Sequence, residues 1–275
     1  MPEAKKEQVL SVRDLDITFK TTAGPVHAIR GVNIDLYKGE TVALVGESGS
    51  GKSVTMKAAM GILAKNATVN SGSIRFSYHH ADGSPETVDL LQKDKKWIRR
   101  HINGKRIAMV FQDPMASLNP RKKVEDIIGE GLDIHHLCKT QAERREKVEK
   151  ILAKVGLAPE HAERYPHQFS GGQRQRVGIA RALIMNPKLI IADECISALD
   201  VSIQAQVVNL MKDIQQETGT AYLFIAHDLS MVKYISDRIG VLHLGHLLET
   251  GTTEEIFEHP IHPYTRSLLS AIPLP

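Results

Sequence analysis

The sequence predicts an α/β fold: a mostly parallel sheet flanked by helices, with an N-terminal antiparallel β portion and a helical insert. Three observations predict this fold. Short, apolar, β-branched runs alternate with helical patterns over much of the chain, an order typical of a parallel sheet covered on both faces. Residues 9–19 alternate between apolar and polar side chains, which indicates a strand with one buried face. Residues 124–165 have helical character and interrupt the alternation.

The individual elements follow from apolar spacing and from turn residues. Residues 21–25 contain glycine and proline and predict a turn, and residues 79–105 are polar and irregular. The helix with the clearest spacing, at residues 201–217, is stopped by Thr218 and Gly219. In chain order we expect strands at 9–19, 26–36, 41–45, 73–76, 106–111, 189–192 and 222–226. We expect helices at 54–63, 173–184, 201–217 and 228–235.

The insert has its own helix signals. Thr140 and Glu143 form a capping-box pattern at the start of a helix, and Gly156 is placed to stop that helix at its C-terminal end. We therefore interpret the chain as a single domain with an inserted helical part. Its predicted parts are an α/β core at 1–115 and 166–258, a helical subdomain at about 116–165, and a C-terminal tail at 259–275.

Composition and charge argue against several classes of protein. The 275 residues carry a net charge of +3, which gives no support for nucleic-acid binding. No apolar run approaches the roughly 20 residues of a membrane helix, and the N-terminus lacks the apolar core of a signal peptide. Only two cysteines occur, Cys138 and Cys195, so neither a disulfide framework nor a cysteine-ligated metal cluster is expected. These features favour the cytosol.

The most informative motif is a phosphate-binding loop between strand 41–45 and the following helix. It fills every fixed position of the pattern G-x-x-x-x-G-K-[ST]. Its glycines let backbone N–H groups turn toward a phosphate, and the helix N-terminus adds partial positive charge. Lys52 can reach the β- and γ-phosphates, and Ser53 can ligate Mg²⁺. The core is therefore predicted to be that of a P-loop NTPase. The loop consists of Gly46, Glu47, Ser48, Gly49, Ser50, Gly51, Lys52 and Ser53.

Two further motifs lie C-terminal to the phosphate loop. The apolar strand at 189–192 ends in Asp193 and Glu194, which beside a phosphate loop indicates a Walker B element. Asp193 is expected to hold Mg²⁺ through water, and Glu194 to orient and polarise the attacking water. Residues 169–173 form a second glycine-rich turn at a helix start, which can present N–H groups to an anion but lacks the lysine. One nucleotide rarely needs two such helix starts, so by itself this turn favours an ordinary N-capped helix.

This set of motifs resembles the nucleotide-binding subunit of an ATP-binding cassette (ABC) transporter. Residues 169–173 and the helix after them are similar to the family's signature motif, which in the family caps the γ-phosphate of ATP held by the other subunit. The resemblance implies that Gln112 is the Q-loop glutamine and that His227 is the switch histidine at the γ-phosphate. It assigns Glu194, His227 and Gln112 to catalysis, and Ser53, Gln112 and Asp193 to the metal. ATP contacts are expected from Phe19, from the phosphate loop, from Ser170, Gly171, Gly172 and Gln173, and from Asp200 in the D-loop.

The resemblance also implies partners and a place in the cell. A second ABC ATPase subunit, either a homologous chain or a second copy of this one, pairs with it head to tail. Transmembrane permease subunits bind the pair, and an extracytoplasmic solute-binding protein acts indirectly. The expected cofactors are ATP and Mg²⁺, with no nucleic acid, and the expected location is the cytoplasmic face of the inner membrane. Residues 111–120, 197–210 and 259–265 resemble ATPases of oligopeptide and dipeptide importers.

Two positions depart from the family pattern, and alternatives stay open. Phe169 replaces the usual leucine at the start of the signature motif, and Cys195 stands where proline commonly follows the glutamate. Because proline fixes φ, Cys195 could loosen the loop that holds Glu194. The alternatives are an importer for nickel or another non-peptide solute, an ABC-type ATPase acting on nucleic acid or ribosomes, and a nucleotide sensor without turnover.

Overall fold

The structure is a computed structural model that describes residues 6–80, 82–197, 199–227 and 229–271. The chain divides into two compact units, one comprising residues 1–103 and 221–275, the other residues 104–220. Two residues of the predicted elements, Ala198 in the D-loop and Asp228 at a helix start, lie outside the described residues.

The first unit contains an antiparallel sheet with strand order β2-β1-β4-β5. In its register, Ile17 faces Ile29 and Leu10 faces Phe76, and all four side chains are buried. Leu15 to Thr18 alternate between buried and half-buried positions, as the apolar pattern predicted, whereas the residues from Val9 to Val12 are all buried. The strands are β1 (Gln8–Thr21), β2 (Gly24–Tyr37), β4 (Ala67–His79) and β5 (Pro85–Asp89).

A second sheet of the same unit contains the strand that leads into the phosphate loop. This strand, β3 (Thr41–Val45), pairs in parallel with β8 (Ala221–Ile225) on one side and β9 (Arg238–His243) on the other. Every residue of β3 and β8 is buried, as expected for parallel strands with both faces covered. The last strand, β10 (His246–Thr252), runs antiparallel to β9.

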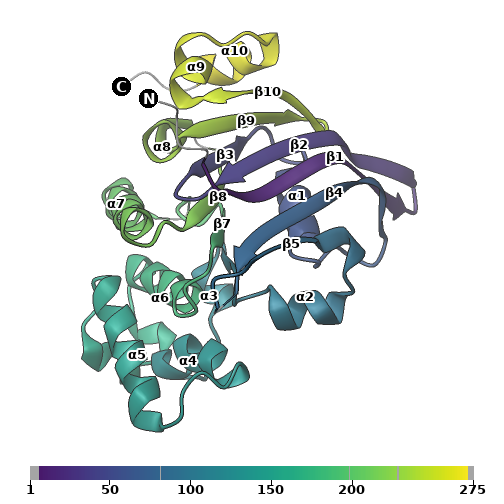
Figure 1. The fold of residues 1–275 in the computed structure, drawn as a ribbon. Helices are drawn as coiled ribbons and strands as arrows, with labels where there is room; N and C mark the ends of the chain where they lie inside the picture. Colours follow the sequence, from purple (N-terminus) through teal and green to yellow (C-terminus); the bar gives the residue numbers. More distant parts are fainter. Residues whose placement is uncertain (1–5, 81, 198, 228, 272–275) are drawn as a thin grey trace, which may run out of the picture. The chain divides into compact units, whose positions relative to one another are not determined.

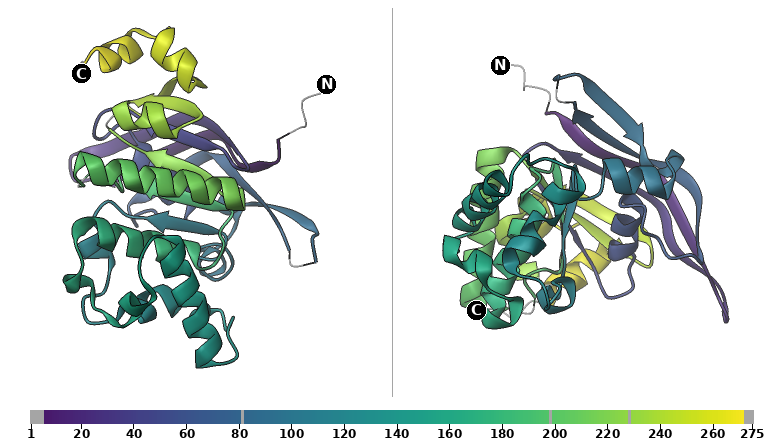
Figure 2. Two further views of the ribbon diagram at one scale, coloured as in Figure 1. Left: turned by 90° about the vertical axis from the view of Figure 1, so that its left-hand side faces the viewer. Right: turned by 90° about the horizontal axis from the view of Figure 1, so that it is seen from below.

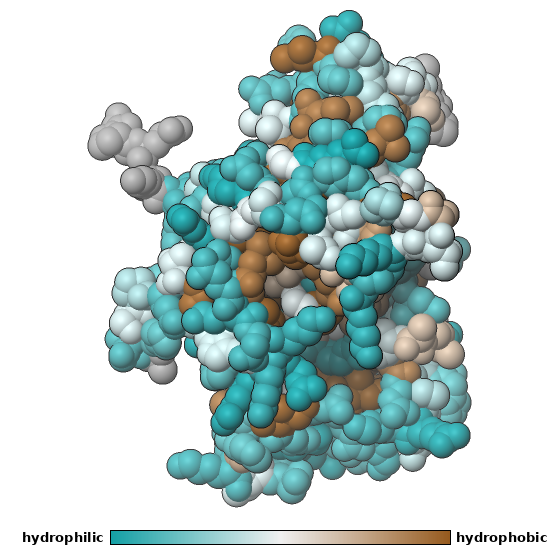
Figure 3. Space-filling model, turned by 90° about the vertical axis from the view of Figure 1, so that its right-hand side faces the viewer, coloured by the Kyte–Doolittle hydropathy of each residue, from teal (hydrophilic) through white to brown (hydrophobic). Residues whose placement is uncertain are grey.

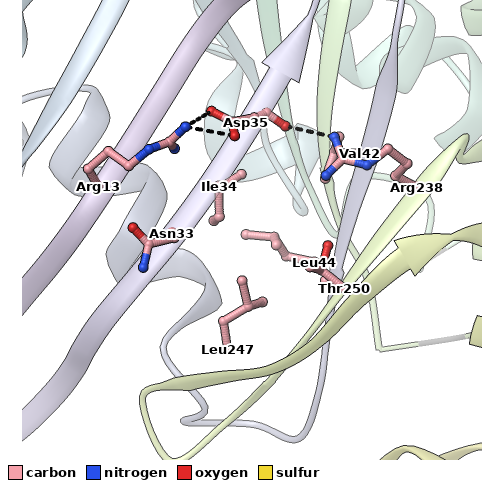
Figure 4. Close-up of a pocket in the computed structure, with 10 residues that line it drawn as sticks. Arg13, Asn33, Ile34, Asp35, Val42, Leu44, Arg238, Leu247 and Thr250 are labelled. Carbon is pink, nitrogen blue, oxygen red and sulfur yellow. Dashed lines mark hydrogen bonds and ion pairs between the residues drawn. The ribbon is translucent and has the colours of Figure 1, made fainter. Parts of the chain in front are cut away.

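The two sheets of this unit pack on each other, with β2 in contact with β10 and with helix α1 (Figure 1). A cavity of about 240 Å³ lies between them (Figure 4). Its floor is apolar, while Arg13 forms an ion pair with Asp35 at 2.7 Å and Arg238 donates to the Asp35 carbonyl at 3.3 Å. The helices of the unit are α1 (Lys52–Ala59), η1 (Leu90–Gln92), α2 (Lys95–His101), α8 (Leu229–Ile235), α9 (Thr253–Glu258) and α10 (Pro263–Ser270).

The second unit combines a parallel strand pair with helices. Strands β6 (Ile107–Val110) and β7 (Leu189–Asp193) pair in parallel, and α6 packs against β6, α4 and α7. Figure 2 shows α7 as a long green helix. The helices are α3 (Pro114–Ser117), α4 (Val124–Ile134), α5 (Gln141–Lys154), η2 (Pro159–Glu163), η3 (Pro166–Gln168), α6 (Gly171–Leu183) and α7 (Val201–Thr218).

The predicted fold class is confirmed, and several segments differ from the predicted elements, among them the strand predicted at 73–76, which belongs to the longer β4. The helix after the phosphate loop ends at Ala59 instead of Leu63, because Gly61 adopts a left-handed φ of 64°. Residues 79–105 are not irregular: β5 pairs with the edge of β4, and Asp94 caps α2 by accepting from the Trp97 N–H. The elements after residue 238 were not predicted.

Hydrophilic side chains cover most of the face drawn in Figure 3, with smaller apolar patches between them.

Candidate nucleotide-binding site

The phosphate loop turns so tightly that two of its positions accept only glycine. Gly46 has φ 142°, and a Cβ there would lie 2.0 Å from the Leu242 carbonyl oxygen. Gly51 has φ 108°, and a Cβ there would lie 2.6 Å from Ile29 Cδ1 and 2.9 Å from the Ala28 oxygen. Backbone from neighbouring strands thus presses on the loop from outside. The two glycines are required for close approach as well as for backbone angle.

Lys52 is the first residue of α1 and is buried, with 6% of its surface exposed. Its ammonium donates to the Gly46 oxygen at 2.6 Å, the Glu47 oxygen at 2.8 Å and Ser50 Oγ at 3.4 Å. A buried cation needs such compensation, since desolvation of an unpaired charge is costly. The loop's own carbonyl groups therefore hold the lysine at the N-terminus of α1, where partial positive charge favours an anion.

The other predicted residues of the first unit lie at strand ends or at the loop surface. Phe19 is half-buried in β1, opposite Val26 of β2 and Ala67 of β4. His227 is exposed and follows the buried strand β8. Of the loop residues, Glu47, Ser48 and Gly49 are exposed, Ser50 is buried, and Ser53 is half-buried on the first turn of α1.

One residue that contacts the loop was missing from the predicted set. The Tyr264 hydroxyl accepts a hydrogen bond from the Glu47 N–H at 3.2 Å. The two residues are 217 positions apart in the chain. The only hint in the sequence was an aromatic residue within the tail motif.

In the second unit, the buried strand β7 ends at the two predicted carboxylates. Glu194 has a φ of 46°, in the left-handed region that a residue with a side chain seldom adopts. Its carbonyl oxygen accepts from Ser197 N at 3.1 Å and Ser197 Oγ at 2.8 Å. Backbone strain of this kind persists only where the surroundings fix it, and it gathers at functional sites. A rigid turn therefore holds Glu194 just after the sheet.

Cys195 follows Glu194 and is 1% exposed. Burial raises the pKa of its thiol from an ordinary 9.0 to about 12, with a smaller contribution from Asp193, while its backbone hydrogen bond acts in the opposite direction. The thiol is therefore neutral at physiological pH and acts as a small apolar side chain. Because folding raises this pKa, the thiol's contribution to stability is complete below about pH 9 and declines as the pH rises toward 12.

The signature turn is built around a capping box. Ser170 Oγ accepts from the Gln173 N–H at 3.3 Å, and Gln173 Oε1 accepts from the Ser170 N–H at 3.0 Å. Ser170 and Gly171 are exposed at the N-terminus of the 13-residue helix α6. Phe169 is 3% exposed and meets the ring of His161 edge-on at 5.2 Å. The larger side chain at this position is accommodated by an aromatic contact within the same unit.

Gln112 and Asp200 are both exposed, Gln112 in the loop that follows β6 and Asp200 directly before α7. Gln112 follows β6, and the neighbouring Asp113 caps α3 by accepting from the Met115 N–H at 2.7 Å. Asp200 is the N-cap residue of α7. Arg181 of α6 donates to the Ser117 carbonyl at 2.5 Å, and desolvation lowers its pKa. The loop after β6 is thus fixed at its α3 end.

The predicted Mg²⁺ ligands supply the right chemistry. Ser53, Gln112 and Asp193 offer a hydroxyl, an amide oxygen and a carboxylate, the hard oxygen donors that Mg²⁺ prefers. Among the residues that the structure describes, no group of three or more His, Cys, Asp or Glu side chains could hold a metal. Mg²⁺ commonly uses one or two protein oxygens together with substrate phosphates and water. The donor set is consistent with that mode.

No helix among the described residues has the length and apolar character to cross a membrane.

A phosphate loop on a parallel strand, with a second glycine turn and a carboxylate-ended strand, defines a nucleotide-binding ATPase. The family model described as ABC transporter matches residues 29–197, and a second, described as oligopeptide/dipeptide transporter C-terminal region, matches residues 248–275. This chain belongs to the ABC transporter family, and the resemblance inferred from the motifs is confirmed.

Relatives and solved structures agree with this assignment. The oligopeptide transport ATP-binding protein OppF of Bacillus subtilis is 55% identical over 98% of this chain and 84% of its own length. The dipeptide transport ATP-binding protein DppF of Lactococcus lactis is 53% identical over 100% and 84%. A dimeric post-hydrolysis ATP-binding cassette bound to ADP and Pi has a TM-score of 0.74 at 25% identity, covering 89% of this chain and 98% of its own. The cbiO1 protein of Clostridium perfringens has a TM-score of 0.75 at 28% identity, covering 92% of both.

The burial of Cys195 predicts unequal thiol reactivity. Under native conditions at pH 8, a thiol reagent should modify Cys138, which is half-buried, and leave Cys195 unmodified because its thiol is buried and neutral. Absorbance with Ellman's reagent should report one thiol in the folded chain and two in denaturant. In Cys138→Ser, the native signal should disappear. Rapid native modification of Cys138→Ser would contradict the burial.

Proposed function

We propose that this chain is the ATP-hydrolysing subunit that powers the import of peptides through a membrane ABC transporter. The observation that carries the proposal is the joint match of the chain and its tail. Identity of 53–55% to oligopeptide and dipeptide transport ATP-binding proteins spans nearly the full chain, and residues 248–275 match the oligopeptide/dipeptide C-terminal region. The geometry of the phosphate loop supports ATP as the ligand, since loop N–H groups and Lys52 suit phosphate oxygens.

Each site residue has a proposed task. The backbone from Gly46 to Ser53 cradles the phosphates, Lys52 neutralises their charge, and Phe19 stacks on the adenine. Mg²⁺, when bound with ATP, neutralises charge that develops on the phosphates, and Ser53, Gln112 and Asp193 hold it. Glu194 orients the attacking water and His227 contacts the γ-phosphate. Catalysis by such a set depends on positioning and electrostatic stabilisation.

The domain organisation and partners are proposed from the same family membership. The chain acts as one ABC ATPase domain, with 116–165 as a helical subdomain and 259–275 as a tail. Two ATPase subunits, both this chain or this chain and a homologue, pair head to tail. Ser170, Gly171, Gly172 and Gln173 of one subunit then complete the site of the other, with Asp200 at the interface. The pair binds transmembrane permease subunits at the cytoplasmic face of the inner membrane.

The solute can be tested on the intact complex. Affinity purification of this chain from membranes should recover the permease subunits, and radiolabelled peptide should enter proteoliposomes containing the complex only with internal ATP. Nickel uptake without peptide uptake would assign the complex to a different solute. Recovery of ribosomes or nucleic acid in place of permeases would overturn the transport proposal.

Lys52→Ala is expected to abolish ATP binding. The variant removes the cation that the loop carbonyls hold at the phosphates, leaving phosphate charge uncompensated in a partly dry site. Isothermal titration calorimetry should show at least a hundredfold loss of affinity, on the order of 3 kcal/mol. Lys57→Ala, which removes an exposed lysine from the same helix, is the matched control and should bind normally. Unchanged affinity in Lys52→Ala would mean that the loop is not the site.

Glu194→Gln is expected to retain ATP binding and to lose hydrolysis. The amide preserves the shape of the side chain but cannot take up a proton, a contribution typically of about 10²- to 10⁴-fold. Single-turnover hydrolysis should slow by that factor, while nucleotide affinity stays near wild type. Glu160→Gln, an exposed substitution on η2, is the control. Hydrolysis at the wild-type rate would transfer the role to another group, with His227 the first to test.

A head-to-tail pair predicts complementation between two inactive variants. Lys52→Ala and Ser170→Arg should each be inactive alone. In a mixed dimer, one site carries both lesions and the other carries neither, so ATPase activity should partly return on mixing. The matched control mixes Lys52→Ala with the double variant, which leaves no intact site and should stay inactive. A site built within one chain predicts no recovery at any ratio.

If the partner is a different ATPase subunit, the two lesions are divided between the partners. A Ser170→Cys substitution in a Cys138→Ser background should then crosslink to a cysteine placed in the partner's phosphate loop when ATP is bound and hydrolysis is blocked. Absence of that crosslink would reject the shared site.

A further inference from the structure

A hydrogen bond joins the C-terminal tail to one peptide group of the phosphate loop. The Glu47 N–H donates to the Tyr264 hydroxyl at 3.2 Å. The carbonyl of the same peptide group belongs to Gly46, and it accepts from Lys52 Nζ at 2.6 Å. In a planar trans peptide the N–H and the C=O point in opposite directions. The Gly46–Glu47 peptide is therefore fixed on one side by Lys52 and on the other by Tyr264.

Tyr264 is itself held firmly against the sheet. Its ring lies on that of His243, the last residue of β9, with centroids 4.1 Å apart. Its own N–H donates to Nδ1 of His262, the N-cap residue of α10, at 3.1 Å. β9 in turn pairs with β3, which leads into the loop, with Val45 opposite Val241. The hydroxyl therefore reaches Glu47 from a fixed position.

The chain leading into α10 is anchored separately by a carboxylate. Glu249 of β10 accepts from the Ile261 N–H at 2.7 Å and the His262 N–H at 3.0 Å. These bonds tie the start of the tail helix to the same sheet. Loss of the Tyr264 hydroxyl alone would leave this anchor and the ring contact with His243 in place.

The hydrogen bond between Tyr264 and Glu47 affects how the loop holds Lys52. Within the loop, Lys52 donates to the oxygens of Gly46 and Glu47 at 2.6 and 2.8 Å, and to Ser50 Oγ over the longer distance of 3.4 Å. The Ser50 bond is the one that a phosphate oxygen replaces at least cost. The two carbonyls then keep the ammonium in place, provided that the Gly46–Glu47 peptide does not rotate.

We propose that Tyr264 is a positioning residue for the nucleotide site. Its hydroxyl fixes the Gly46–Glu47 peptide so that the loop carbonyls present Lys52 to the phosphates, and it couples nucleotide occupancy to the order of the tail helix α10. The proposal rests on the proposed function, since it requires that the loop binds nucleotide. Coupling between two sites is reciprocal, so bound nucleotide must also stabilise the tail contact.

The test uses Tyr264→Phe, which keeps the ring on His243 and removes only the hydroxyl. With MgADP as the probe, calorimetry should give a Kd about fivefold weaker than wild type, equivalent to about 1 kcal/mol. The thermal midpoint should stay close to that of wild type. Tyr234→Phe, which removes a hydroxyl from a tyrosine on α8 that is 53% exposed, is the matched control and should bind as wild type.

A second measurement distinguishes positioning of the phosphate loop by the Tyr264 hydroxyl from a purely structural role of that hydroxyl. In the wild-type chain, MgADP should slow hydrogen–deuterium exchange across α10, and in Tyr264→Phe this protection should be absent. Glu47→Pro removes the donor from the other side of the contact, so Tyr264→Phe should have no additional effect in that background. A further fivefold loss there would show that the hydroxyl acts elsewhere.

The outcomes distinguish the two proposals. A wild-type chain that fails to bind MgADP overturns the proposed function itself. Wild-type binding with an unchanged Kd in Tyr264→Phe overturns the role of Tyr264 alone. Exchange across α10 that is the same with and without MgADP in the wild-type chain also overturns it, whether or not the variant folds.

Discussion

The structure around the phosphate loop depends on one buried cation. Lys52 is almost fully buried, and its charge is stabilised by the carbonyl oxygens of Gly46 and Glu47 in its own loop. Those oxygens can face inward only because the loop lies tight against β9 and β2, where Gly46 and Gly51 leave no space for a side chain. Lys52 is thus held in one place by three neighbouring features: the buried parallel strand β3, the two glycines and the start of α1. That arrangement keeps a positive charge at the N-terminus of α1 while burying it almost completely.

Features set by nearby residues could be predicted from the sequence. The loop, the strand before it and the helix after it are contiguous, and the capping box of Ser170 and Gln173 spans only four residues. Contacts between distant segments could not be predicted. The bond between Glu47 and Tyr264 joins residues 217 positions apart, and β5 forms because the edge of β4 is available to it. Asp94, by contrast, is a local cap for α2 that the pattern of residues 79–105 could have indicated.

Cys195 shows how a departure from a family pattern can be accommodated. From the sequence, a cysteine in place of proline could loosen the loop that holds Glu194. In the structure this turn is held by other means: Ser197 donates twice to the Glu194 carbonyl, and the Cys195 side chain is buried. Packing and hydrogen bonds here do what a fixed φ does elsewhere.

The tight approach of Gly46 to the Leu242 carbonyl also limits how this protein can evolve. Every single-base change in a glycine codon that alters the residue adds a Cβ, and at this position that atom would lie 2.0 Å from a backbone oxygen. All amino-acid substitutions that a single base change can produce at Gly46 are thus excluded for the same steric reason. None of them is a milder substitution that selection could retain. Substitutions in the loop are tolerated instead at Glu47 and Ser48, whose side chains are exposed. Divergence among descendants of this chain should accumulate at those two positions, while the backbone path stays fixed.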